Sequence, residues 1–170
     1  MYHNFIKKTT FLCTAVVMGC LIISGCATKK NVEPEEVVAI PKNASSETIS
    51  KELGATPSSQ ETNEDSGISA DNYENSTFAG YDGQISFYYG EDGSVLYYKW
   101  FITEKEEKKA KEIYSDVCEA LAGSYGDGEE NNSTASGVYT TSFTNGKQQI
   151  TAQMQKSNSS GFEISYMVVG

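Results

Sequence analysis

Aromatic and aliphatic side chains alternate with polar ones on both sides of Asp92-Gly93. An Asp-Gly pair between two such runs is typical of the turn that closes a β-hairpin. Six large side chains would then share one face of the hairpin, in the pairs Ile85–Trp100, Phe87–Tyr98 and Tyr89–Leu96. The opposite face would hold Ser86, Tyr88, Tyr97 and Lys99. A shift of one residue would scatter the apolar set over both faces, so the pattern predicts this register.

Asn145-Gly146 predicts a second hairpin by the same argument. Its inward pairs would be Tyr139–Ala152, Thr141–Ile150 and Phe143–Gln148, and its outward side chains Thr140, Ser142, Gln149 and Thr151. A polar turn over residues 156–161 then leads to a last strand, whose inward side chains would be Phe162, Ile164, Tyr166 and Val168.

The segment between the hairpins has the 3.6-residue period of a helix. Thr103 and Glu106 have the spacing of a capping box, which predicts the start of the helix there. Its apolar stripe would consist of Ala110, Ile113, Tyr114, Val117, Cys118 and Leu121. Gly123 can end the helix in a left-handed conformation. Cys118 lies on the stripe, so we interpret it as a small core residue and not as a nucleophile.

These elements together predict an α+β fold for residues 81–170. The expected architecture is a small two-layer domain, with a mostly antiparallel five-stranded sheet, one helix on one face and the order ββαβββ. A single core of about 90 residues is viable without disulfides.

The composition changes near residue 80. Residues 27–80 hold all three prolines, ten acids and four lysines, but only two aromatic residues. Such a stretch buries too little apolar surface to offset the entropy of ordering it. We therefore predict that residues 26–80 form a disordered acidic stalk that starts at Cys26, with a partner-binding tail as the alternative.

The first residues have the three-part layout of an export signal. Lys7 and Lys8 precede an apolar run over residues 11–23, and the run closes on Ile23-Ser24-Gly25-Cys26. This segment resembles the signal peptide and lipobox of bacterial lipoproteins. The resemblance implies cleavage of residues 1–25 and a lipid on Cys26 that holds the chain to a membrane. A second box, Val17-Met18-Gly19-Cys20, is weaker because it would leave apolar residues on the new end, and an uncleaved anchor is the other interpretation.

Cleavage before Cys26 changes the chemistry that remains. The single histidine, His3, would leave with the signal, and the whole chain has no arginine. The mature chain would keep two cysteines, Cys26 and Cys118, of which the first is lipidated, so no internal disulfide is expected. It would hold 11 lysines against 23 acids, a net charge of −12. This balance argues against binding to nucleic acid or to anionic lipid headgroups.

The missing residue types also exclude most catalytic chemistry. Serine and cysteine mechanisms lack their histidine base, zinc sites lack their usual ligands, and no arginine or phosphate-binding loop supports phosphoryl transfer. We therefore expect no enzyme activity, no cofactor and no metal. A hydrolase built on paired carboxylates is a third and weaker hypothesis.

Two features are candidates for recognition. The loop over residues 123–137 holds Tyr125 and the acids Asp127, Glu129 and Glu130, but lacks the spacing of a calcium-binding loop, so a solvated loop is the favoured interpretation. The sheet face away from the helix is the second candidate, with Tyr88, Tyr97, Lys99, Gln149 and Gln153 as its expected ligand-binding residues and Ser86, Thr140 and Thr151 beside them. Tyrosines and amides can bind sugars or peptides, although high strand propensity also explains them.

We therefore expect a lipid-anchored accessory or binding lipoprotein without catalytic activity. Its location would be the extracytoplasmic face of the cell membrane, or the outer membrane where the source has one. Its partners would be the membrane, through the lipid on Cys26, and a glycan, peptide or protein ligand. The alternative is a structural or regulatory envelope protein, such as an inhibitor or an assembly factor, that binds a protein partner through a sheet edge.

Overall fold

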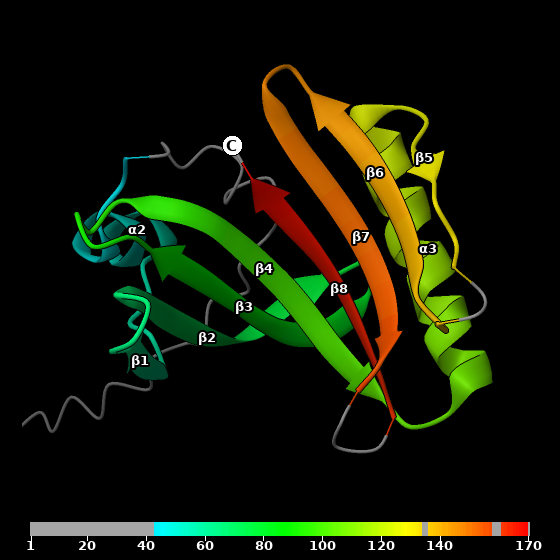
Figure 1. Cartoon of the computed structure of the whole chain (residues 1–170), viewed down its shortest axis with the longest axis horizontal. Helices are drawn as coiled ribbons and strands as arrows, with labels where there is room; N and C mark the ends of the chain where they lie inside the picture. Colours follow the sequence, from blue (N-terminus) through cyan, green and yellow to red (C-terminus); the bar gives the residue numbers. More distant parts are fainter. Residues whose placement is uncertain (1–42, 134–135, 158–160, 170) are drawn as a thin grey trace, which may run out of the picture.

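The computed structural model of the chain describes residues 43–133, 136–157 and 161–169 (Figure 1). The predicted signal peptide, Cys26 and the stalk up to residue 42 lie outside the described residues, as do residues 134 and 135 of the acidic loop.

The described residues form one eight-stranded sheet and two helices. The helices are α2 (Ser46–Leu53) and α3 (Glu107–Tyr125). The strands are β1 (Ser59–Asn63), β2 (Ile68–Phe78), β3 (Tyr81–Tyr89), β4 (Val95–Glu104), β5 (Glu129–Glu130), β6 (Tyr139–Asn145), β7 (Gln148–Lys156) and β8 (Phe162–Val169). All pairs are antiparallel, in the order β1-β2-β3-β4-β8-β7-β6-β5.

The prediction of five strands and one helix is wrong. The five expected strands and the long helix are present as β3, β4, α3, β6, β7 and β8, but β5 and the elements α2, β1 and β2 extend the fold. The last three occupy residues 46–78, which composition assigned to the stalk. β2 pairs with β3 along nearly its whole length, although Ile68, Tyr73 and Phe78 are its only large apolar side chains.

A buried carboxylate explains how so polar a segment joins the core. Asp71 of β2 is 3% exposed and accepts hydrogen bonds from Ser46 Oγ at the start of α2, from Gln60 Nε2 of β1 at 2.7 Å and from Tyr89 Oη of β3 at 2.9 Å. A buried charge is tolerated when donors satisfy it, and these donors come from three other elements. Burial and the adjacent carboxylate together raise the pKa of Tyr89, which therefore stays a donor.

The first predicted hairpin is confirmed in register over most of its length. Ile85 pairs with Trp100 and Phe87 with Tyr98, as expected. Near the turn the register shifts, so that Tyr89 lies opposite Val95 instead of Leu96.

The second hairpin is displaced by two residues from its predicted pairing. Phe143 lies opposite Ile150, and the loop consists of Gly146 and Lys147, with Gly146 at φ 61°. Because side chains alternate with a period of two, this displacement leaves every side chain on its predicted face. The alternation of polar and apolar residues therefore could not distinguish the two pairings.

The ends of α3 also differ from prediction. Thr103 belongs to β4, and Glu106 is the N-cap without a side-chain bond to the helix, so the predicted capping box is wrong. The Glu104 carboxylate instead accepts from the backbone N–H groups of Lys105 and Glu106 at 2.7 and 3.2 Å. At the other end, Gly126 at φ 82° follows the helix, where Gly123 was expected.

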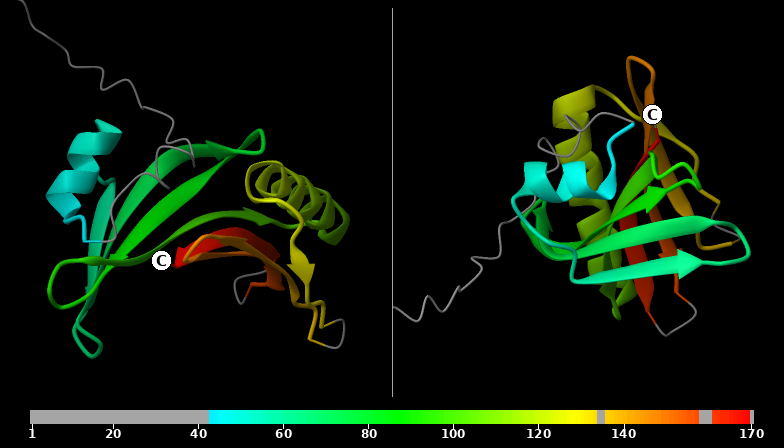
Figure 2. Two further views of the ribbon diagram at one scale, coloured as in Figure 1. Left: turned by 90° about the horizontal axis from the view of Figure 1, so that it is seen from above. Right: turned by 90° about the vertical axis from the view of Figure 1, so that its left-hand side faces the viewer.

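Both helices pack on the same face of the sheet. α3 contacts β4, β6, β7 and β8. The α2 serines Ser46 and Ser50 bond Asp71 and Tyr73 of β2, which point to the same side as Phe87. Figure 2 shows that the sheet twists strongly between the end under α2 and the end under α3. The core lies between this face and the helices, around Trp100, Tyr166 and Phe78.

Candidate functional site

The other face of the sheet has no described helix or strand over it (Figure 2). We call it the open face. Its side chains on the central strands are Ser86 and Tyr88 of β3, Tyr97, Lys99 and Phe101 of β4, and Glu163, Ser165 and Met167 of β8. The predicted face is thus present where the first hairpin placed it.

Two tyrosines stack on the open face, near the turn that joins β3 and β4. Tyr88 and Tyr97 lie directly opposite each other on β3 and β4, with ring centroids 4.4 Å apart and an angle of 18° between the rings. Both side chains are half-buried. Desolvation, with the neighbouring Tyr88 as a smaller cause, raises the pKa of Tyr97, so its hydroxyl is neutral and available to donate or accept.

Lys99 lies beside this pair, but its positive charge is balanced by an ion pair with Glu163. Its Nζ lies 2.7 Å from Glu163 Oε1 and 5.4 Å from the centroid of the Phe101 ring. The ion pair is about a quarter exposed on both sides. Lys99 therefore contributes little net positive charge to the face.

Gln149 and Gln153 share the face but not the neighbourhood of the tyrosines. Both belong to β7, and β8 lies between β7 and β4. Gln149 lies opposite Val169, which lies opposite Tyr97 on the next strand. Gln153 lies opposite Ser165, which lies opposite Phe101. The predicted site residues therefore fall into a tyrosine-lysine group and a separate glutamine group.

Three adjoining depressions indent the open face over β1 to β4. Their volumes are about 430, 290 and 340 Å³. The first two share Glu61, Ala70 and Tyr88, and the second and third share Glu74, Gln84 and Phe101, so the three form one shallow groove. We refer to it as the open-face groove.

Half of this groove lies on β1 and β2, two strands that the sequence pattern did not predict. Glu61 and Glu74 lay in the presumed stalk, and nothing local in their sequence indicates a neighbouring tyrosine. Phe101 could have been found, because it has the same parity as Tyr97 and Lys99 on the first hairpin.

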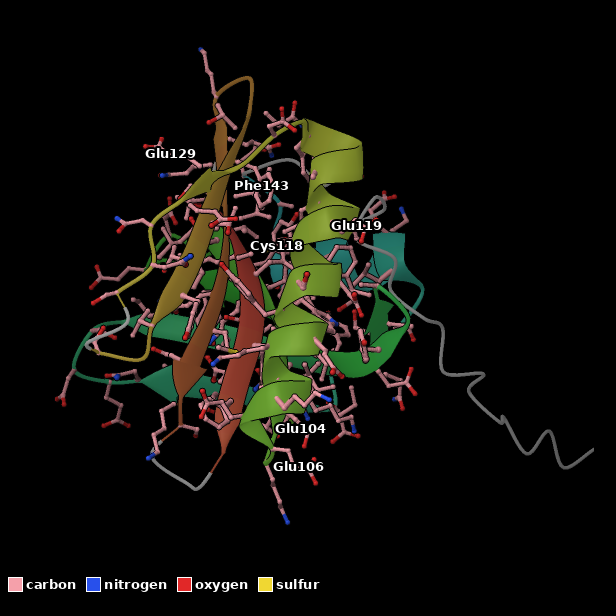
Figure 3. All side chains as sticks on the ribbon, turned by 90° about the vertical axis from the view of Figure 1, so that its right-hand side faces the viewer. Glu104, Glu106, Cys118, Glu119, Glu129 and Phe143 are labelled. Atoms are coloured by element: carbon pink, nitrogen blue, oxygen red, sulfur yellow. The ribbon has the colours of Figure 1, made fainter. Side chains whose placement is uncertain are left out.

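The acidic loop and Cys118 are weaker candidates for a binding site than the open-face groove. Gly123 and Tyr125 belong to α3, and Glu129 and Glu130 pair with β6 as strand β5. Figure 3 shows Cys118 on the side of α3 that faces the sheet, with Glu119 directed away from it. Burial raises the pKa of the Cys118 thiol, which keeps it protonated, as expected of a core cysteine.

The residues that the structure describes contain no group of three acidic, histidine or cysteine side chains that could hold a metal ion. Within the same ranges, neither helix is long and apolar enough to cross a membrane. Comparison with protein-family models, curated proteins and solved structures found no match to this chain. The open-face groove is therefore the candidate site on its own geometry.

Proposed function

We propose that this protein is a lipid-anchored, extracytoplasmic binding lipoprotein without catalytic activity, and that its ligand contacts the open face. The observation that supports this most is the stacked pair Tyr88 and Tyr97 at the edge of a groove over four strands. Tyrosines offer a large contact area at a low cost in side-chain entropy, and their hydroxyls orient a polar ligand. The lipobox at Cys26 supports the location.

The shape of the site favours binding over catalysis. The groove is shallow and lies on a sheet surface, whereas catalytic sites usually enclose most of a small substrate. The mature chain also lacks histidine and arginine. Buried Asp71 could have been a general base, but its oxygens accept hydrogen bonds from three neutral donors. These bonds connect β2 to α2, β1 and β3.

Binding of a partner through a sheet edge is less well supported. β1 is one outer strand, and its five residues are all exposed, but they are polar and include Glu61. The other outer strand, β5, has two residues, both acidic. Short, polar and charged strands at an edge discourage pairing with another chain.

Replacing both stacked tyrosines by threonine tests the face. We expect the Tyr88→Thr/Tyr97→Thr variant to bind cell-envelope fragments of the source bacterium about tenfold to a hundredfold more weakly, because paired aromatic residues are typical binding hot spots. Threonine keeps the strand propensity, so the cost in stability should be limited to the ring contact, about 0.5–1.5 kcal/mol. Co-sedimentation at several protein concentrations measures the affinity, and thermal melting measures the stability.

The matched control is Tyr81→Thr, which removes a tyrosine from the other face, where its hydroxyl donates to Asp116 of α3 at 2.6 Å. This variant should bind as the unchanged protein does. Equal binding by all three proteins would show that the ligand contacts another surface.

The anchor is tested at the lipobox cysteine. We expect Cys26→Ala to abolish incorporation of labelled fatty acid and to leave either uncleaved precursor or released protein, because the thiol is the only group there that can form the thioether. Gel fluorography of labelled cells and fractionation into membrane and soluble material measure both effects. Cys20→Ala is the control and should keep its label; loss of label in Cys20→Ala alone would move the lipobox upstream.

A further inference from the structure

We infer that the open-face groove binds an extended polypeptide segment with regularly spaced lysine or arginine side chains. This inference rests on the proposed function, and it names the class of ligand for the same face. It comes from the shape of the groove, from its two unlike walls and from its charge.

The groove runs along the strand direction and has a floor of small or slender side chains. Ala70, Asn72, Ser86 and Gln84 line it on β2 and β3. Ser86 Oγ donates to Asn72 Oδ1 at 2.6 Å, and Asn72 Nδ2 donates to Ser59 Oγ at 3.1 Å, so the floor is cross-linked and rigid. From Tyr97 to Thr103 the groove follows β4 for about 20 Å, which is the length of six extended residues.

The walls of the groove differ in chemistry. Aromatic rings stand on the β3–β4 side, namely Tyr88, Tyr97 and Phe101. Carboxylates stand at the other side and at the end, namely Glu61 on β1, Glu74 on β2 and Asp82 on β3. Ring faces and carboxylates are the two groups that bind ammonium and guanidinium side chains.

No described lysine neutralises these carboxylates. Asn72 Nδ2 lies 3.5 Å from Glu61, and Asp82 accepts from Thr77 Oγ1 at 2.8 Å, but both partners are neutral. The ion pairs among the described residues involve Glu104, Glu107, Glu112 and Glu163 only. Lys99, the lysine nearest the groove on β4, is paired with Glu163. The groove is therefore negative, and a cationic ligand complements it.

A neutral glycan fits these features less well. It would use the aromatic wall but would leave two or three carboxylates without a counter-charge. An extended basic peptide uses both walls, because its alternate side chains point to opposite sides of its backbone. The proposal therefore commits to a peptide, and glycan binding becomes an outcome of the test.

The test uses a fluorescein-labelled decapeptide of alternating lysine and threonine, with the full mature chain and fluorescence anisotropy. We expect saturable binding that weakens as salt is raised, and no binding of the matching peptide of glutamate and threonine. The Glu61→Gln/Glu74→Gln variant should bind the lysine peptide about tenfold more weakly, since both acids contact the groove. The control Glu52→Gln/Glu119→Gln makes the same change in charge on exposed positions of α2 and α3 and should alter the affinity less than twofold.

Equal weakening in the two glutamine variants would overturn the inference, because attraction to the acidic chain as a whole would then explain the binding. No binding of the lysine peptide, or binding of a chitin hexasaccharide that Tyr88→Thr/Tyr97→Thr abolishes, would also overturn it, while leaving the proposed face in place. The proposed function fails separately, if the tyrosine variant binds envelope fragments as the unchanged protein does.

Discussion

Residues 79–170 expressed without the preceding segment are expected not to fold, whereas residues 43–170 should unfold in one cooperative transition. Without β2, strand β3 loses its partner along nearly its whole length. Ile85 and Phe87 lose Tyr73, and Trp100 loses Phe78 and its hydrogen bond to the Ser76 carbonyl. An exposed apolar edge strand of this kind also promotes aggregation. Circular dichroism during thermal melting, with sedimentation to detect aggregates, distinguishes the two fragments.

This expectation differs from what composition alone indicates, which is a domain that begins at residue 81. A fragment of residues 79–170 that melts cooperatively near the temperature of residues 43–170 would show that α2, β1 and β2 contribute little to the core. A Tyr73→Ala change in the longer fragment gives an intermediate case, because it keeps β2 but removes its largest buried side chain.

Trp100→Ala is expected to destabilise the domain by about 3–5 kcal/mol. Trp100 is fully buried, stacks on Tyr166 with ring centroids 5.8 Å apart and contacts Phe78 edge-on. Its Nε1 donates to the Ser76 carbonyl at 2.9 Å, at the irregularity that shifts the β2–β3 register. Removal of the side chain thus leaves a large cavity and abolishes this hydrogen bond. Denaturant unfolding followed by circular dichroism measures the loss.

Trp100→Phe separates the two contributions. It keeps most of the ring packing but removes the N–H donor, so its cost should be smaller, about 1–3 kcal/mol. A loss of less than about 1 kcal/mol in Trp100→Ala would mean that the site collapses to fill the cavity, and that the core does not depend on this ring.

Features that depend on a short repeat of polar and apolar residues were predictable. In the first hairpin the period of two placed Tyr88 and Tyr97 together on the outward face, and the structure keeps them there. In the second hairpin the same period predicted the correct faces but not the pairing, since a displacement of two residues conserves the pattern. The stripe of α3 was predictable for the same reason, whereas its first residue depended on Glu104, which no local capping pattern indicates.

The sequence alone thus predicts an export signal, the long helix and the two faces of the central strands. It also shows that residue types common in catalysis are scarce. Only the tertiary structure shows that residues 46–78 belong to the folded domain, as α2, β1 and β2. Their apolar content is too low to indicate burial. What joins them to the core is the side chain of Asp71, which is hydrogen-bonded to residues up to 25 positions away. The groove also follows from long-range contacts, because the pairing of β2 with β3 brings the acidic wall on β1 and β2 to the aromatic wall on β3 and β4. Contacts between distant segments leave no periodic trace in a single sequence, and that is why this half of the site could not be predicted.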